Sequence, residues 1–453
     1  MRIPDEKLIV DSWRLHDGIL STKVFESWFY TLSRAVSVDI RKTTLSDTKW
    51  FYDSAVGQIV NTNRTFFQIS GIRSETIEHP VLLQEEIGLL GMLCKPIKGL
   101  MHFLVNAKIE PGNVNRMQVS PTIQATKSNF TQTHGGAKPR YLDWFLNASK
   151  GIYIVDQIQS EQSSRFFGKR NRNIIIMLDE NTAVEESPTH MWLTLGQIKK
   201  LMRIDNFVNM DTRTVLSCIP FYKYDFGSLD TPLIRSIVAG EQSDILPRIY
   251  HFINECKMFN ASKPELVHLY SLSNWETEKH DGIEEFVCKA YYPFKVVFCD
   301  ISIEGREVRH WGQPLFEALG NATFGLFTRV FNGVREFLVH AKQEVGCFDK
   351  IELGPTVQLE STEKPSNDIE RLFFERYSAN LHVQYDVVLS EEGGRFYHEQ
   401  NKNIIIEVEP DIIPNPPPGY WWCTYRTLCK LVQINNILNI QLRNLLSLLE
   451  IDS

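Results

Sequence analysis

The stretch Phe103-Leu-Val-Asn-Ala-Lys108-Ile-Glu110-Pro-Gly112 returns later in the chain as Phe337-Leu-Val-His-Ala-Lys342-Gln-Glu344-Val-Gly346, a shift of 234 residues (342 minus 108). At the same shift, Pro121-Thr-Ile-Gln124 returns as Pro355-Thr-Val-Gln358. Self-similarity at a fixed shift is the signature of a repeated structural unit. The stretch therefore indicates that one unit is written twice.

Two further blocks follow in the same order in both copies. Ser160-Glu-Gln-Ser-Ser-Arg165-Phe166 corresponds to Ser390-Glu-Glu-Gly-Gly-Arg395-Phe396, at a shift of 230 residues (395 minus 165). Asn171-Arg-Asn-Ile-Ile-Ile176 corresponds to Asn401-Lys-Asn-Ile-Ile-Ile406. The third block pairs Trp192 with Trp422, Asn206 with Asn436 and Arg213 with Arg443. Three blocks in one order identify a tandem duplication.

Each copy is expected to be an α+β unit. The short apolar runs bounded by Gly, Pro and Asn predict strands, and residues 192–218 and 422–449 have the apolar spacing of helices. Strands followed by helices favour an α+β layout over a doubly wound sheet. The predicted organisation is a helical N-terminal segment, a first repeat, a helical connector and a second repeat, over residues 1–48, 49–220, 221–262 and 263–453. Two such similar copies are expected to pack as an internal pseudo-dimer.

Composition narrows the classes of protein. The 453 residues are 43% hydrophobic and 23% charged, and the net charge of -7 argues against a nucleic-acid binder. The first seven residues lack the apolar core of a signal peptide, and Lys95, Pro96 and Lys98 interrupt the most apolar stretch. We therefore expect a cytoplasmic protein that does not cross a membrane. The eight cysteines include no CxxC pair, which favours reduced, buried thiols.

Two polar segments are candidates for ligand binding. The first runs from Lys108 to His134 and is rich in amide and hydroxyl groups, as a sugar or nucleobase requires, although strands with one wet face also alternate polar residues. The second, Arg165 to Asn173, is the main basic cluster of the chain. Guanidinium groups match phosphate oxygens, so this cluster predicts a diphosphate site, while the alternative is a solvated turn.

Comparing aligned positions suggests where acid–base chemistry occurs. The second copy has Glu352 and Glu392 where the first has Gln118 and Gln162, and it has Tyr397 and His398 where the first has Phe167 and Gly168. Proton transfer needs titratable groups, so these residues of the second copy are candidates for acid–base chemistry, although exposed Glu and His residues are common. Which half forms the catalytic pocket stays open, because residues of both copies can meet across a pseudo-dimer. No GxGxxG, P-loop, HExxH or GxSxG motif is present, so neither a metal nor a redox cofactor is expected.

Several segments, in order along almost the whole chain, resemble NDP-hexose 2,3-dehydratases. They are Lys108-Ile-Glu-Pro-Gly-Asn113, Gln118-Val-Ser-Pro-Thr-Ile-Gln-Ala-Thr126, Lys169-Arg-Asn-Arg-Asn173, Val208-Asn-Met-Asp-Thr-Arg-Thr-Val-Leu216, Glu352-Leu-Gly-Pro-Thr-Val-Gln358 and Glu391-Glu-Gly-Gly-Arg-Phe-Tyr-His398. The resemblance implies two Nudix-like domains, a homodimer, a dTDP-linked 4-keto-6-deoxyhexose substrate and a place in deoxysugar biosynthesis. It also implies a labile diketo product, which suggests a 3-ketoreductase as the next enzyme. The chain lacks the metal-binding box of Nudix hydrolases.

The implied reaction needs a base, an acid and groups that stabilise negative charge. Removal of the C3 proton beside the C4 ketone gives an enolate, which expels the C2 hydroxyl. The predicted catalytic residues are Glu392, Tyr397, His398 and Glu352, with Lys342 and Arg395 as charge stabilisers. The predicted substrate-binding residues are Lys108, Gln124, Glu161, Arg165, Lys169, Arg170, Arg172, Gln358 and Asn401.

Two other functions use similar residues. A non-catalytic sugar-nucleotide sensor would have the same binding site but would eliminate no water. A Nudix-type hydrolase would release nucleoside monophosphate with the help of magnesium.

Overall fold

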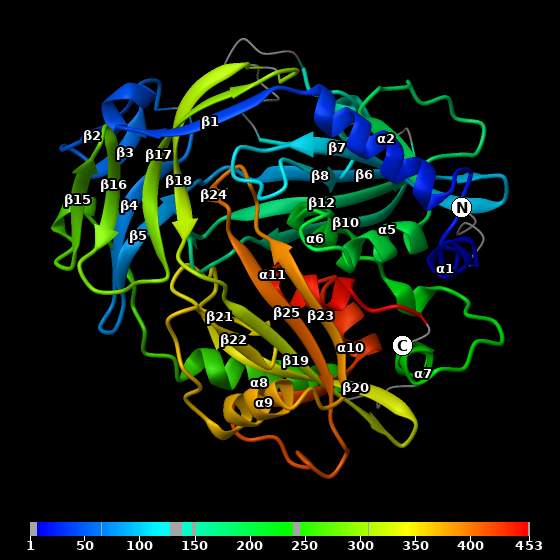
Figure 1. The fold of residues 1–453 in the computed structure, drawn as a ribbon. Helices are drawn as coiled ribbons and strands as arrows, with labels where there is room; N and C mark the ends of the chain where they lie inside the picture. Colours follow the sequence, from blue (N-terminus) through cyan, green and yellow to red (C-terminus); the bar gives the residue numbers. More distant parts are fainter. Residues whose placement is uncertain are drawn as a thin grey trace.

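The computed structural model describes residues 7–64, 66–126, 138–146, 151–238, 245–306 and 308–451. Of the polar segment that begins at Lys108, residues Ser128, Asn129 and His134 lie outside the described residues. The chain is a mixed α+β protein with four mixed β-sheets and two repeated halves (Figure 1).

The first half contains the elements that run from α1 to α6. In order they are α1 (Leu8–Arg14), α2 (Thr22–Ala35), β1 (Val38–Thr43), β2 (Trp50–Asp53), β3 (Gln58–Asn61), β4 (Gln68–Arg73), β5 (Glu78–Leu83), β6 (Gly88–Ile97), β7 (Leu100–Ile109), β8 (Met117–Ser120), β9 (Ile123–Ala125), α4 (Leu142–Leu146), β10 (Ile152–Ser160), β11 (Phe166–Phe167), β12 (Arg170–Met177), β13 (His190–Leu193), α5 (Leu195–Met202) and α6 (Met210–Ser217).

The second half repeats this order of helices and strands. Its elements are α7 (Pro232–Val238), α8 (Ile245–Met258), β14 (Glu265–Val267), β15 (Trp275–His280), β16 (Ile283–Cys288), β17 (Phe294–Ile303), β18 (His310–Ala318), β19 (Thr323–Phe331), β20 (Val334–Gln343), β21 (Ile351–Gly354), β22 (Val357–Leu359), α9 (Asp368–Ser378), β23 (Val383–Ser390), β24 (Phe396–Tyr397), β25 (Gln400–Glu407), β26 (Tyr420–Thr424), α10 (Tyr425–Leu431) and α11 (Ile440–Ser447).

The helices in front of each set of strands belong to this repeat. Phe25 and Phe29 are the buried aromatic residues of α2, and Ile249 and Ile253 are buried at the corresponding places in α8, 224 residues later (249 minus 25). A spacing of four residues places each pair on one helical face. The helices of the predicted N-terminal segment and of the predicted connector are therefore equivalent parts of the two halves.

Two predicted helical stretches begin later than expected. Trp192 lies in β13 and Trp422 in β26, because both residues pair with the long central strands β7 and β20. The helices start only at side-chain caps, Thr194 before α5 and Thr424 before α10. Residues 38–43, within the expected helical N-terminal segment, form strand β1. The Phe-Leu-Val runs and the Ile-Ile-Ile runs are strands, as predicted.

The two halves exchange their first strands. β1 of the first half pairs antiparallel with β17 of the second half, and β14 of the second half pairs antiparallel with β4 of the first. The sheets are therefore β15-β16-β17-β18-β24 with β1 (sheet A) and β11-β5-β4-β3-β2 with β14 (sheet B), besides β10-β12-β6-β7-β13 with β8 and β9 (sheet C) and β21-β20-β19-β25-β23 with β22 and β26 (sheet D). Because strands cross over, neither half completes its outer sheet alone.

Apolar burial holds the halves together in two places. Sheets A and B share one aromatic core, in which Phe166 of the first half meets Phe396 of the second edge to face at 5.8 Å. Helices α6 and α11 pack against each other between sheets C and D (Figure 1).

All eight cysteines are free thiols, five of them buried. None of the described helices is long and apolar enough to cross a lipid bilayer.

Candidate functional site

A chain of polar contacts begins at the end of β7 in the first half. Lys108 Nζ lies 2.9 Å from Glu110 Oε1, and Gln124 Nε2 of β9 donates to the same oxygen at 3.0 Å. Asn209, the N-cap of α6, donates from Nδ2 to Gln124 Oε1 at 3.3 Å. Burial opposes ionisation of Glu110, but nearby cations, above all Lys108, hold its pKa below the ordinary value. These contacts place an anionic carboxylate against a lysine at the start of α6.

Asp211 projects from the first turn of α6 into the same region. Its side chain is 1% exposed, and neither carboxyl oxygen has a hydrogen-bond partner among the described residues. Burial raises the pKa of Asp211 well above its ordinary value, and the charges of Glu392 and Glu161 raise it further. Buried polar groups are normally hydrogen-bonded, so both oxygens of Asp211 are available to water or to a ligand. Asp211 is held toward its protonated form.

Two side chains of the second half reach into this region from the turn between β23 and β24. A Cβ added to Gly394 would touch Glu392 Oε1 and lie 3.7 Å from Glu110 Oε1, so these two carboxyl groups border one space. Arg395 stacks on Phe67 at 4.4 Å, and its hydrogen bonds within the described part of the chain go to neutral oxygens, those of Gly394 and Gln84. Burial raises the pKa of Glu392, while Arg395 opposes that rise.

Glu161 and Lys169 complete this group. Asn171 donates to Glu161, and Lys169 Nζ donates to the backbone oxygen of Glu86 at 2.6 Å. Burial raises the pKa of Glu161 to about 7, with a further contribution from the negative charge of Glu392. Burial lowers the pKa of Lys169 to about 8. What we call the first cluster comprises Lys108, Glu110, Gln124, Glu161, Lys169, Asn209 and Asp211 of the first half with Glu392 and Arg395 of the second.

The second half builds an equivalent group with the roles of the halves exchanged. Gln358 Nε2 donates to Glu344 Oε1 at 2.9 Å, Asn439 Nδ2 donates to Gln358 Oε1 at 2.9 Å, and Lys342 Nζ donates to the backbone oxygen of Gln358 at 3.3 Å. The side chains that cross over now come from the first half. What we call the second cluster comprises Lys342, Glu344, Gln358, Glu360, Glu391, Glu399, Asn439 and Gln441 of the second half with Gln162 and Arg165 of the first.

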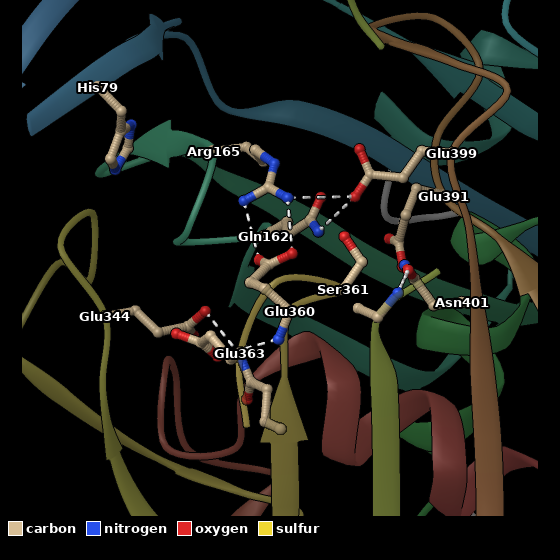
Figure 2. A network of polar contacts seen from close by, with 12 residues as sticks. His79, Gln162, Arg165, Glu344, Glu360, Ser361, Glu363, Glu391, Glu399 and Asn401 are labelled. Atoms are coloured by element: carbon tan, nitrogen blue, oxygen red, sulfur yellow. Dashed lines mark hydrogen bonds and ion pairs between the residues drawn. The ribbon is translucent and has the colours of Figure 1, made fainter. Parts of the chain in front are cut away.

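An ion pair dominates the second cluster. Arg165 makes two parallel hydrogen bonds to Glu360, of 2.9 and 3.0 Å, and Glu399 lies 3.8 Å from the same guanidinium (Figure 2). Gln162 Nε2 donates to Glu399 Oε1 at 3.1 Å. Burial raises the pKa of Glu399 to about 7 although Arg165 opposes it. The positive charge of Arg165 is therefore balanced by carboxylates of the protein itself.

The two clusters differ at four equivalent positions. The first has two titratable groups where the second has amides, and it has a lysine and a threonine where the second has carboxylates. The pairs are Asp211 and Gln441, Glu392 and Gln162, Lys169 and Glu399, and Thr126 and Glu360. Proton transfer needs titratable groups and anion binding needs cations, and at these positions the first cluster has both.

Six residues predicted from the sequence meet in the first cluster: Lys108, Gln124, Glu161, Lys169, Glu392 and Arg395. The sequence left open which half each titratable residue faces, and the structure brings Glu392 of the second half into the first cluster. Its carboxyl group acts on Asp211 and Glu161 of the first half, while Gln162 crosses in the opposite direction. The interlocking of the halves is the physical reason.

Four other predicted residues, Arg165, Lys342, Gln358 and Asn401, belong to the second cluster or support it. Asn401 Nδ2 donates to Glu391 Oε1 at 2.9 Å, and its own oxygen accepts from the backbone of Ala322 at 3.0 Å. Glu352 is buried nearby between the halves, where Ser160 Oγ donates to it at 2.5 Å. Burial raises the pKa of Glu352 to about 7.

The remaining predicted residues lie outside both clusters. Tyr397 stacks on His398 at 4.2 Å, with Lys42 of β1 5.6 Å from the tyrosine ring. Arg170 stacks on Phe348 of the second half at 3.9 Å.

Arg172 also lies outside the clusters and forms an exposed ion pair with Asp156 on the neighbouring strand. The basic segment that begins at Arg165 is therefore divided among several surroundings. Of the cations in this segment, Lys169 belongs to the first cluster.

The sequence reasoning missed Asp211 as a site residue. A signal was present, because Asn209 and Asp211 stand where the second copy has Asn439 and Gln441. An asparagine followed by an acidic residue is also the ordinary start of a helix, so the pattern alone did not distinguish a site from a cap. Glu360 and Glu399 were missed because they face an arginine of the other half.

Within the described ranges, no group of three or more His, Cys, Asp or Glu side chains is arranged to hold a metal ion. The cations Arg395, Lys108 and Lys169 offer positions for the oxygens of an anionic ligand.

The fold and the first cluster together define a class: a duplicated α+β protein with a buried group of titratable residues assembled from both halves. A family model described as NDP-hexose 2,3-dehydratase matches the chain over residues 22–219 and 247–449, segments that begin at α2 and close to the start of α8. The chain belongs to the NDP-hexose 2,3-dehydratase family and is an enzyme of the dehydratase type.

Three curated relatives span nearly the same length as this chain. A dTDP-4-dehydro-6-deoxy-alpha-D-glucopyranose 2,3-dehydratase from Saccharopolyspora spinosa is 37% identical, and the alignment covers 95% of this chain and 92% of the relative. Proteins of the same name from Streptomyces violaceoruber and Amycolatopsis orientalis are 35% and 32% identical. Those alignments each cover 95% of this chain and 97% and 91% of the relatives.

Proposed function

We propose that the chain removes water from a dTDP-linked 4-keto-6-deoxyhexose and that the first cluster is its active site. The observation that carries the site assignment is Asp211, a buried carboxyl beside Glu392 and Lys108 whose equivalent in the second cluster is the amide Gln441. The names of the relatives support the substrate class. Lys108, Gln124 and Glu392 are each partly exposed, which gives a ligand access from their side.

In this proposal the substrate binds to Arg395 and Lys169, two cations that form no ion pair with a carboxylate of the described residues. Among the described residues, Arg395 and Lys169 donate to neutral oxygens alone, so both can exchange these contacts for oxygens of the diphosphate. Gln124 and Asn209 present amide groups that suit the hydroxyls of a sugar.

In the first half of the proposed reaction, the carboxylate of Glu392 takes the proton from C3. The C4 ketone acidifies that proton because the resulting charge spreads onto the C4 oxygen. Lys108 donates to this oxygen as its charge develops. A raised pKa makes Glu392 a stronger base than an ordinary carboxylate, while Arg395 keeps a fraction of it ionised.

In the second half, the electron pair of the enolate forms the C2–C3 double bond and the C2–O bond breaks. Asp211 donates its proton to the departing oxygen, which leaves as water. The remaining enol becomes a 3,4-diketo-2,6-dideoxy sugar, and Glu392 returns its proton to Asp211 through the medium. The balance is the loss of one water, and no hydride or electron is exchanged.

Other parts of the sequence hypothesis carry over as proposals. Tyr397, His398 and Glu352, predicted from the sequence as candidate acid–base residues, now receive supporting roles, because the first two lie beside Lys42 and the third lies between the halves. We also propose a Nudix-like origin for each half, a homodimer, a cytoplasmic location and a 3-ketoreductase as the next enzyme. Cross-linking in solution and size measurement test the dimer.

The decisive experiment incubates purified protein with dTDP-4-keto-6-deoxyglucose, without added metal or NADPH, and traps the diketo product. Formation of that product by the wild-type chain and its loss in Asp211→Asn support the proposal. Tight binding without product would identify a sensor. Release of nucleoside monophosphate only with magnesium would identify a hydrolase.

A further inference from the structure

We propose that Glu360 closes the second cluster, so that each chain binds one nucleotide sugar, in the first cluster alone. This inference rests on the proposed function only in taking a nucleoside diphosphate as the ligand. The occupant of the second cluster is then a side chain of the protein itself.

The geometry of the Arg165–Glu360 pair is that of a bound anion. Both terminal nitrogens of Arg165 donate to Glu360, at 2.9 and 3.0 Å, in the two-point contact that a phosphate would make. The arginine side chain is 3% exposed, and Glu360 retains 23%. A ligand phosphate would have to displace this carboxylate and leave it without its cation, which is costly in a buried place.

Arg395 provides the matched case in the first cluster. It stacks on Phe67 at 4.4 Å, as Arg165 stacks on the equivalent Phe294 at 4.3 Å. Its guanidinium, however, forms no ion pair with a carboxylate of the described residues. The position equivalent to Glu360 is Thr126, which carries no charge.

The charges around each arginine reinforce this difference. Glu399 lies 3.8 Å from Arg165, whereas the equivalent residue near Arg395 is Lys169. A change from lysine to glutamate reverses the charge that an approaching diphosphate meets. The second cluster therefore opposes an anion twice, through Glu360 and through Glu399.

The local backbone holds Glu360 in place. Glu360 follows β22 directly, its backbone nitrogen donates to Glu363 Oε2 at 2.9 Å, and its backbone oxygen accepts from the nitrogen of Glu363 at 3.0 Å (Figure 2). This turn aims the carboxylate at Arg165. Thr, the residue of the first half, is therefore the natural substitution to reopen the site.

Calorimetric titration with dTDP, the nucleotide without the sugar, tests the proposal. We expect one dTDP per wild-type chain and two per chain in Glu360→Thr. Arg395→Ala should abolish binding to the otherwise wild-type chain, and the double variant Glu360→Thr with Arg395→Ala should regain one dTDP. Glu360→Gln, which keeps the shape and removes the charge, should also gain a second, weaker site.

Two dTDP per wild-type chain would overturn the proposal, as would a stoichiometry that neither Glu360 variant changes. Circular dichroism and thermal unfolding report whether each variant is folded, and Glu360→Gln replaces Glu360→Thr if the latter is not. Turnover of the keto sugar is measured on the same samples and should be unchanged in Glu360→Thr. Absence of diketo product in the wild type would refute the proposed function while the dTDP count still tests the closure.

Discussion

The backbone of Gly112 lies so close to the carbonyl oxygen of Phe396 that a Cβ on the glycine would overlap it. The nitrogen of Gly112 donates to the oxygen of Gly393 at 2.7 Å, and its oxygen accepts from the nitrogen of His398 at 2.8 Å. The loop after β7 is thereby locked into the turn that carries Glu392 and Arg395 of the other half. Gly346 makes the equivalent contacts with residues 163–168.

Gly112→Ala is expected to destabilise the protein and to lower activity together. The added methyl group must push the 392–396 turn away, at a cost of about 1–3 kcal/mol for overpacking, and this displaces Glu392 and Arg395 from the first cluster. Thermal unfolding and turnover measure the two effects. Gly346→Ala is the matched variant, with the same loss of stability but a smaller loss of kcat. Equal losses of kcat would argue against the assignment of the active site.

Asp211→Asn is expected to lower kcat by about 10²–10⁴-fold, because it removes the proposed proton donor while keeping the size of the side chain. The KM for the keto-sugar nucleotide should change little. Gln441→Asn alters the equivalent position of the second cluster and should leave kcat near the wild-type value. A fully active Asp211→Asn enzyme would rule out the acid.

The pH dependence of kcat gives an independent reading of Asp211. Its pKa is raised by burial, so the protonated form survives to higher pH than for an ordinary carboxyl, and activity should fall on the alkaline side as that proton is lost. In Asp211→Asn the residual activity should no longer show this alkaline limb. Persistence of the same limb in the variant would assign it to another group.

Arg395→Lys is expected to raise KM by about 10–100-fold, because a single ammonium cannot reproduce the two-point contact of a guanidinium with phosphate. Steady-state kinetics with the dTDP-linked substrate measure this effect. Arg172→Lys changes an exposed arginine paired with Asp156 and serves as the control, with KM unchanged. An unchanged KM in Arg395→Lys would move the diphosphate site elsewhere.

The wild-type protein is expected to lose stability between pH 5 and pH 8, and Glu352→Gln is expected to reduce that loss. The pKa of Glu352 rises from 4.5 to about 7 on folding because the carboxyl is buried. Between these pH values the folded chain holds a proton that the unfolded chain has released, so stability falls as pH rises.

The ionisation of Glu352 lowers the free energy of unfolding by at most about 3 kcal/mol between these pH values, at about 1.4 kcal/mol for each pKa unit, and the glutamine removes this loss. Urea unfolding at both pH values measures it, with Glu75→Gln on an exposed turn as the control. A pH slope identical to that of the wild type would show that Glu352 ionises normally.

Prediction from sequence was strongest where the pattern is local or repeated. The short apolar runs Phe103-Leu-Val and Ile174-Ile-Ile, bounded by Gly, Pro and Asn, predicted the strands β7 and β12. It was weakest at Trp192, where a helical spacing continues through a strand that pairs with β7. There the pairing of β13 with β7 outweighed the local pattern, and the helix begins only after the capping residue Thr194.

The sequence by itself determined the duplication, the strand-rich units and the family, since all three are recorded in the order and spacing of residues along the chain. Only the tertiary structure decided that Glu392 lies near Asp211 and Glu161 of the opposite half and that Glu360 pairs with Arg165. The physical reason is that the halves exchange strands β1 and β14 and interlock at Gly112 and Gly346. Charges far apart in the chain are thereby brought together across an interface that no spacing along the sequence describes.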